Sequence, residues 1–284
     1  MSETLEFQTF SGQPYTISHD PTDRADTIYC LALHKSGSVL FDNLVKGICR
    51  AAGRSCIDVE VQLFRQGLNF SHCDHMLLDF CGRPGFVHSG FRGLWQLMLL
   101  RRFRESRKLM LVRDPRDIAI SFYHSMAKSH TVPKDGAVRD LVMQNRDRAR
   151  SQEPSDYVIN GGVDGVLQNF NAFAMISRNR ASGEWHVYRY EDVVYRKLDW
   201  ARDIAGKLNV QLPEEVIAEI VAKEDVFPEK EDASKHIRRV HPGGYRESLS
   251  PDAVAYIEDR CAKAMKVFDY EPDRARAPGG AEVA

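Results

Sequence analysis

The 284-residue sequence lacks any long apolar run. Its densest apolar stretch, Leu94–Leu100, is far shorter than the roughly 20 residues that a membrane-spanning helix requires. The first ten residues, MSETLEFQTF, contain neither the basic segment nor the apolar core of a signal peptide. We therefore expect no integral membrane segment and a cytoplasmic protein.

Net charge is almost absent as well, because 39 Lys and Arg residues balance 40 Asp and Glu residues. A chain this close to neutral has no overall field that attracts nucleic acid, so we expect no nucleic-acid partner. The balance is uneven, since residues 101–150 contain thirteen basic and six acidic side chains. Such a zone indicates either an anionic small ligand or a solvated basic surface, and charge alone leaves both open.

Common motifs for binding metals and nucleoside triphosphates are missing too. The six cysteines include no C-x-x-C pair, and the cluster His72–His75 with Cys81 matches no standard zinc spacing. A G-x-x-x-x-G-K-[ST] loop is also absent, which counts against ATP or GTP as a phosphoryl donor. We therefore expect no bound metal.

What the sequence does contain is an alternation of strands and helices. Thr27–Leu33 and Lys108–Val112 are continuous apolar runs, typical of strands buried on both faces. Further strands are predicted at 57–61, 85–89 and 184–190. Strands that alternate with helices predict a single-domain α/β fold, with a central parallel sheet flanked by helices.

Three segments are expected along the chain. Residues 1–26 are polar and predict a loose lead-in, residues 27–270 form the folded domain, and residues 271–284 form a disordered tail. Within the domain, apolar periodicity predicts helices at 39–52, 91–103, 118–128, 137–149, 163–180, 191–208, 213–223 and 251–267.

The loop after the first strand, Lys35-Ser36-Gly37-Ser38-Val39, leads directly into a helix. Ligands of open parallel sheets bind beyond the carboxyl ends of the strands, and the N–H groups that begin a helix attract anions. Gly37 permits close approach, while Lys35 adds a charge and Ser38 a hydroxyl. The pattern favours a phosphate-binding strand-loop-helix, with an ordinary turn as the alternative.

A second strand leads into the segment Arg113–Ser121, which also enters a helix. Arg113 stands in the loop and Ser121 two turns into the helix, where both can reach one anion. An arginine binds phosphate through two parallel hydrogen bonds. The alternative is a surface network of Arg and Asp, which contributes little to stability. A third candidate anion clamp is the pair Arg238-Arg239, followed by the glycine-containing segment 243–246.

Together these pieces resemble, in order, the motifs of the sulfotransferases that use 3′-phosphoadenosine 5′-phosphosulfate (PAPS), over residues 28–267. Lys35–Ser38 looks like the loop that binds the 5′-phosphosulfate in cytosolic-type members. Arg113 and Ser121 look like the motif that holds the 3′-phosphate. Two departures stand in the first loop, where His34 replaces a usual Pro and Val39 replaces a Thr or Ser.

The resemblance continues in the second half of the chain. Tyr190, followed by Glu-Asp, is similar to the tyrosine that meets the adenine. Arg238 and Arg239 resemble the basic pair of the C-terminal nucleotide-binding segment, although Val240 replaces the glycine that normally follows it. The cofactor-binding residues implied by the resemblance are Lys35, Ser36, Gly37, Ser38, Val39, Arg113, Ser121, Tyr190, Arg238 and Arg239.

The resemblance implies a reaction. A sulfuryl group would pass in line from PAPS to a hydroxyl, leaving 3′,5′-ADP and needing no metal. Lys35 would act catalytically by stabilising the leaving phosphate, and the N–H groups of Ser36, Gly37 and Ser38 would hold it. The acceptor would be a small molecule, a glycan or a lipid with a hydroxyl. Neither its identity nor the oligomeric state follows from the sequence.

The general base is the least determined part of the site. His88 is the first candidate, because it follows the apolar run Gly85–Val87 and precedes Arg113 by 25 residues, a spacing similar to that of the family's catalytic histidine. Glu60 and Asp58 are alternatives, because some glycan-type sulfotransferases use a carboxylate. Two rival functions also remain, a sulfotransferase-like module that binds nucleotide or anion without turnover and a small-molecule kinase.

Overall fold

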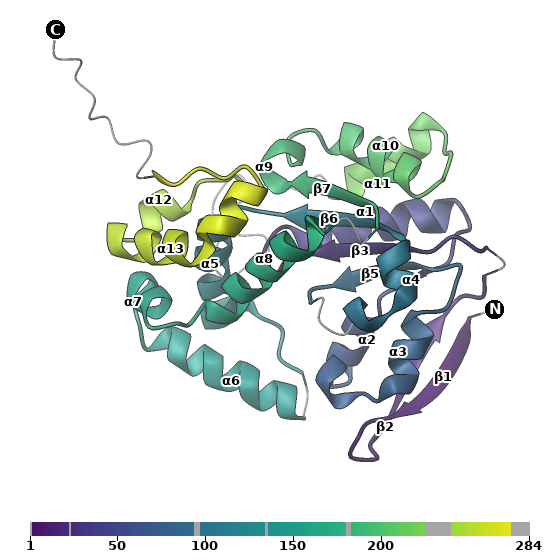
Figure 1. Cartoon of the computed structure of the whole chain (residues 1–284), viewed down its shortest axis with the longest axis horizontal. Helices are drawn as coiled ribbons and strands as arrows, with labels where there is room; N and C mark the ends of the chain where they lie inside the picture. The colour runs from purple at the N-terminus through teal and green to yellow at the C-terminus, as the bar shows by residue number, and fades with distance from the viewer. Residues whose placement is uncertain are drawn as a thin grey trace, which may run out of the picture.

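A five-stranded parallel sheet forms the centre of the computed structural model, which describes residues 2–22, 24–93, 97–133, 136–179, 183–224 and 240–273. The strands lie in the order β4 (Cys56–Ile57), β5 (Val87–Phe91), β3 (Ile28–Ala32), β6 (Arg107–Val112) and β7 (Trp185–Arg189), and Figure 1 labels the last four. All four neighbouring pairs are parallel. The predicted single-domain α/β fold is confirmed.

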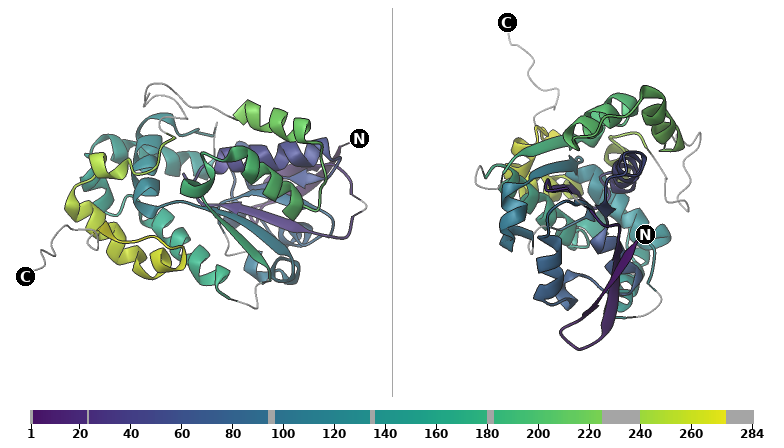
Figure 2. Two further views of the ribbon diagram at one scale, coloured as in Figure 1. Left: turned by 90° about the horizontal axis from the view of Figure 1, so that it is seen from above. Right: turned by 90° about the vertical axis from the view of Figure 1, so that its right-hand side faces the viewer.

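Helices cover both faces of the sheet, so the central strands are buried on both sides. Alternate residues of β3 point to opposite faces, and every residue of the strand is buried. One face packs against α5 (Pro115–His124) and α8 (Asp164–Ser177), with α13 (Pro251–Val267) on top of both. The other packs against α1 (Ser38–Ala51), α10 (Lys197–Lys207) and α11 (Glu214–Glu224), which Figure 2 shows on one side of the sheet.

The remaining helices are short or peripheral. They are α2 (Val59–Arg65), α3 (His75–Cys81), α4 (Arg101–Glu105), α6 (Ala137–Arg150), α7 (Pro154–Ile159), α9 (Tyr190–Val193) and α12 (Tyr245–Ser248), with 3-10 turns η1 (Phe70–His72) and η2 (Leu97–Leu99) and a π-helical turn η3 (Ser125–Ser129). No helix within the described ranges is long and apolar enough to cross a membrane.

The N-terminal segment differs from the loose lead-in that its composition predicts. Residues Glu3–Gln8 and Pro14–His19 pair as an antiparallel hairpin, β1 and β2. Alternate side chains of β2 are buried, and Ile17 is fully enclosed. Phe7 stacks on Tyr15 at 5.5 Å between ring centroids and meets Phe80 of α3. The hairpin exists because a few inward side chains find an apolar partner far along the chain.

Two predicted elements between the first and second central strands are also different. The strand expected at 57–61 is only Cys56–Ile57, and the chain turns into α2 at Val59. The helix expected at 91–103 does not form as one unit, because Phe91 pairs with Leu31 as the last residue of β5. Residues 94–96 lie outside the described part of the chain, and η2 and α4 follow.

The first three residues of the expected disordered tail are held in place. Asp273 accepts a hydrogen bond from the Tyr245 hydroxyl at 2.9 Å, and its Oδ1 lies 3.2 Å from Arg116. The Arg116 guanidinium also donates to the carbonyl of Glu271. Residues 274–284 of the expected tail lie outside the described residues.

Candidate functional site

The candidate residues gather at one edge of the sheet, because the carboxyl ends of parallel strands lie side by side. His34 and Lys35 follow β3, Arg92 follows β5, Arg113 follows β6, Tyr190 follows β7, and Glu60 lies shortly after β4. Arg113 and Lys35 come from neighbouring strands, and Nη1 of Arg113 donates to the Lys35 carbonyl at 3.4 Å. The first and second predicted motifs are therefore in contact.

The loop before α1 has the backbone of an anion-binding turn. Lys35 and Gly37 both have positive φ, 65° and 88°, a region that residues with a Cβ atom rarely adopt. A Cβ on Gly37 would lie 2.7 Å from the Tyr190 ring, so only glycine fits there. No described side chain caps the N-terminus of α1. Its first N–H groups, which have no partner inside the helix, are thus free to bind an anion.

Ser36 takes a different place from the one expected. Its hydroxyl and its N–H group both donate to the carbonyl of Leu33, at 2.7 and 3.2 Å, and the residue is fully buried. That N–H therefore already has a partner within the loop, and its contact with a phosphate stays a prediction. The anion-binding donors that remain are at Gly37, Ser38 and Val39, and Val39 exposes its side chain to solvent.

Two cationic side chains lie at this loop, Lys35 within it and Arg113 beside it. Burial and the nearby Arg113 lower the pKa of Lys35 to about 8, so that the ammonium is still mainly protonated at pH 7. The Arg113 side chain is 9% exposed, lies 3.6 Å from Asp117, and has a buried Nε without a hydrogen-bond partner. Burial and nearby cations, Arg92 foremost, lower the pKa of His34 to about 3, so this residue adds no charge at neutral pH.

The second motif continues along α5. Ser121 lies one turn beyond Asp117, on the same face of the helix, and is half-buried. Asp117 also accepts hydrogen bonds from the N–H groups of Gly243 and Tyr245, at 2.6 and 3.2 Å. The glycine-containing C-terminal segment thus packs against the Arg113 motif. Arg238 and Arg239 themselves lie outside the described residues.

Tyr190 is buried and contacts both motifs. Its ring touches Gly37, lies 4.6 Å beneath the Arg113 guanidinium, and is 5% exposed. Its hydroxyl donates to the carbonyl of Val240 at 2.8 Å. These contacts fix the loop that contains Gly37, the Arg113 side chain and the backbone at Val240 relative to one another.

His88 is not at a strand end. It is the second residue of β5, pairs in register with Tyr29, and is fully buried in a parallel ring stack at 4.7 Å from that tyrosine. Three further residues of β5 separate it from the carboxyl edge, about 10 Å at 3.3 Å per residue. Neither ring nitrogen has a hydrogen-bond partner among the described residues, and burial lowers the pKa of His88 to about 3. The predicted position is wrong, and the structure does not bring His88 to Lys35.

Glu60 occupies the carboxyl edge instead. Its Oε2 accepts a hydrogen bond from the N–H of Arg92 at 2.7 Å. Burial raises the pKa of its carboxyl to about 7, although hydrogen bonds and the charge of Arg92 oppose the rise. Asp58, the other carboxylate considered, is paired with Lys46 at 2.6 Å. Arg92 is not among the site residues predicted from the sequence. The feature that would have indicated it is its position directly after β5.

The basic zone at 101–150 has a mainly structural explanation. Arg146 and Arg150 of α6 donate to backbone carbonyls in and around η3, while Arg139 and Arg148 donate to other loop carbonyls. Of this zone, Arg113 belongs to the candidate site. The described residues contain no group of three or more His, Cys, Asp or Glu side chains that could hold a metal ion.

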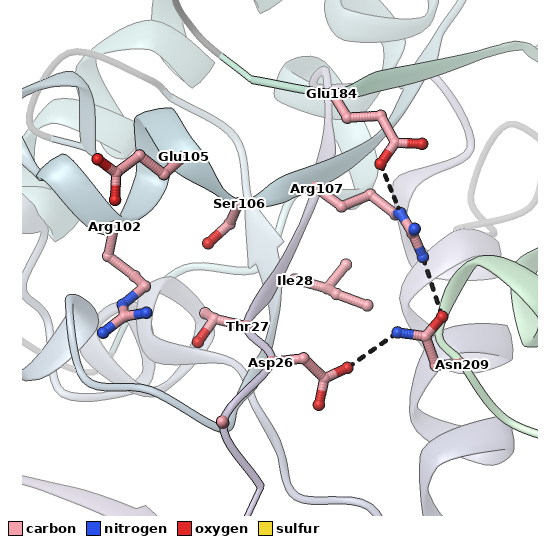
Figure 3. Close-up of a pocket in the computed structure, with 10 residues that line it drawn as sticks. Asp26, Thr27, Ile28, Arg102, Glu105, Ser106, Arg107, Glu184 and Asn209 are labelled. Carbon is pink, nitrogen blue, oxygen red and sulfur yellow. Dashed lines mark hydrogen bonds and ion pairs between the residues drawn. The ribbon is translucent and has the colours of Figure 1, made fainter.

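Figure 3 shows a polar pocket at the opposite edge of the sheet, where the strands begin. Arg107 binds Glu184 at 3.0 Å and Asn209 at 3.2 Å, and Asn209 donates to Asp26 at 3.0 Å. These contacts join the starts of β3, β6 and β7 to the end of α10. The bonded residues Asp26, Arg107, Glu184 and Asn209 explain this side of the pocket as a structural junction.

Comparison with known proteins bears on the fold. No family model matches the sequence, and no curated protein matches it. The chain is similar to the structure of mouse sulfotransferase SULT7A1 complexed with PAP, with a TM-score of 0.55 and 12% identity over 88% of this chain and 90% of that one. At this identity the likeness shows a shared fold, and the chain has the sulfotransferase fold.

Two further solved structures are similar over most of their length. One is retinol dehydratase in a complex with retinol and PAP, with a TM-score of 0.47 and 16% identity over 93% of this chain and 90% of that one. The other is a sulfotransferase from Alicyclobacillus acidocaldarius, with a TM-score of 0.41 and 15% identity over 88% of this chain and 98% of that one.

Proposed function

We propose that the protein transfers a sulfuryl group from PAPS to a hydroxyl of an acceptor and releases 3′,5′-ADP. A fold hosts many reactions, so the proposal rests on the site. The observation that carries it is the contact between Arg113 and the Lys35 carbonyl, which joins two anion-binding motifs that lie 78 residues apart. PAPS carries phosphate at both ends of its ribose, so two neighbouring anion sites match its chemistry.

The residues have separable roles in this proposal. The first N–H groups of α1 and the Lys35 ammonium bind the 5′-phosphosulfate, which supplies the sulfuryl group. Arg113 and Ser121 bind the 3′-phosphate, together with Arg238 and Arg239. Tyr190 positions both phosphate-binding segments through its contacts with Gly37 and Arg113.

Glu60 is the general base of the proposed mechanism. The carboxylate takes the proton of the acceptor hydroxyl as the bond from that oxygen to sulfur forms. The bond between sulfur and the bridging oxygen breaks, and Lys35 neutralises the charge that develops on the leaving phosphate. A carboxyl with a pKa near 7 suits this task, since it is partly deprotonated at neutral pH and still basic. The acceptor is a small molecule, a glycan or a lipid.

The first prediction concerns nucleotide choice. We expect 3′,5′-ADP to bind much more tightly than 5′-AMP, and Arg113→Ala to remove most of that difference. A charged hydrogen bond contributes about 1.5–3 kcal/mol, so the expected loss for 3′,5′-ADP is about 10- to 100-fold. Isothermal titration calorimetry measures both nucleotides on both variants. Equal affinities on the wild-type protein would refute the proposed 3′-phosphate site.

The second prediction concerns metal. Lys35 and Arg113 supply the positive charge that magnesium supplies in phosphoryl transfer. Transfer from labelled PAPS, screened against acceptors of each class, is therefore expected to continue in excess EDTA. Loss of activity in EDTA with recovery on adding magnesium contradicts this and favours a kinase. Tight 3′,5′-ADP binding without transfer to any acceptor indicates a binding module instead.

A further inference from the structure

A buried ion pair lies between the proposed base and the phosphate-binding helix. Asp42 is on α1, one turn after Ser38, and is 4% exposed. Its Oδ2 lies 2.5 Å from Nη2 of Arg92, while its Oδ1 accepts the N–H of Gly90 at 3.1 Å. Arg92 in turn donates its own N–H to Glu60. Asp42 of α1 is therefore connected to the Glu60 carboxyl through Arg92, the residue that follows β5.

We infer that Asp42 is a positioning residue for the proposed reaction: through Arg92 it holds Glu60 at the sheet edge and sets the pH range in which Glu60 accepts a proton. The inference rests on the proposed function, and it adds a residue that touches neither nucleotide nor acceptor. Because Asp42 lies on α1, which begins directly after the loop containing Lys35 and Gly37, the same contacts fix the base relative to the sulfuryl donor.

The charges around Glu60 give the direction of the effect. From the end of β5, the Arg92 guanidinium and the N–H groups of Arg92 and Gly93 favour the carboxylate. From α1, the Asp42 carboxylate opposes it, and from α3 the Cys81 thiol lies close enough for Glu60 to raise its pKa. Asp42 thus acts twice, because it repels the Glu60 carboxylate and also neutralises the cation that favours it.

Two substitutions therefore have opposite effects. Asp42→Asn removes a negative charge and leaves the Arg92 cation unbalanced, so Glu60 deprotonates more easily. Arg92→Gln removes the cation, so Glu60 deprotonates less easily, while the backbone hydrogen bond to Glu60 remains. Charges a few ångströms apart shift a carboxyl pKa by about one unit or more. A purely structural support would lower the rate in both variants without moving the pH profile in opposite directions.

The test is the pH dependence of transfer from labelled PAPS at saturating donor. The acidic limb of the profile is expected to move down by about half a unit or more in Asp42→Asn and up by a similar amount in Arg92→Gln. Asp203→Asn is the matched control, because it removes the same charge from α10, where Asp203 accepts a hydrogen bond from Tyr188. Its acidic limb is expected to coincide with that of the wild type.

Carbon-13 NMR of the side-chain carboxyls gives the same readout without turnover, with the Glu60 signal assigned from Glu60→Gln. If Asp42→Asn does not fold, Arg92→Gln measured in this way decides the case. An active wild type whose acidic limb and Glu60 titration stay unchanged in the variants overturns the role of Asp42. A wild type that transfers no sulfuryl group to any acceptor class overturns the proposed function, and this inference with it.

Discussion

Glu60→Gln is expected to reduce the rate of sulfuryl transfer by about 10²- to 10⁴-fold, the range that general-base catalysis contributes. Glutamine keeps the size of the side chain and can still accept the hydrogen bond from the Arg92 N–H, but it cannot take a proton. Binding of 3′,5′-ADP is expected to be unchanged, because the proposed nucleotide-binding groups, Lys35, Arg113 and the first N–H groups of α1, are kept. Single-turnover rates and calorimetry on the same preparations separate these two effects.

The pH dependence of the rate tests the role of Glu60 independently. Glu60 acts when deprotonated and its pKa is raised to about 7, so wild-type activity should fall as the pH decreases through 7. The residual activity of Glu60→Gln should lack that acidic limb. His88→Phe is the matched control, since it keeps a ring stacked on Tyr29 and removes two buried nitrogens that have no partner. If His88→Phe loses the limb and Glu60→Gln keeps it, His88 is the base.

Lys35→Ala is expected to reduce the rate of transfer by about 10²- to 10³-fold, as the loss of one group that stabilises developing charge does. Nucleotide affinity should fall much less, since Arg113 and the first N–H groups of α1 remain. Kd for 3′,5′-ADP and the single-turnover rate measure the two quantities. A loss of affinity as large as the loss of rate would show that Lys35 mainly binds the nucleotide.

The buried position of Lys35 also predicts the basic limb of the profile. Lys35 acts when protonated, and burial beside Arg113 lowers its pKa to about 8, so activity should decline as the pH rises through 8. Lys35→Arg keeps a charge that titrates only above about pH 12. Whatever activity this variant retains should therefore persist above pH 9, and a basic limb that stays near pH 8 would assign it to another group.

The positions of the Lys35–Val39 loop and of Arg113 at strand ends could be predicted because their signals are local. A buried strand, a loop with Gly37 and an amphipathic helix lie next to one another in the sequence, and the segment around Arg113 repeats that order. Parallel strands then place the two loops at one edge without further information. The long-range contact between Arg113 and the Lys35 carbonyl follows from this rule.

The positions of His88 and Glu60 relative to the sheet edge could not be predicted, because they depend on pairing and burial. Whether His88 is at the end of a strand is decided by its register with Tyr29, and a shift of two or three residues leaves the local sequence pattern unchanged. The raised pKa of Glu60 likewise comes from desolvation by residues that are distant in the chain. The hairpin at Glu3–His19 was missed for a related reason, since its inward side chains find partners far along the chain, such as Phe80 of α3 and Phe86 before β5.

By itself, then, the sequence determined the alternation of strands and helices and the placement of the Lys35 and Arg113 loops directly after two buried strands. Only the tertiary structure decided that Ser36 bonds to Leu33, that Tyr190 contacts both Gly37 and Arg113, and that Asp42 reaches Glu60 through Arg92. The physical reason is that propensity and hydrophobic periodicity act over one or two turns. Hydrogen-bond partners, desolvation and pKa values instead depend on which distant segments pack together.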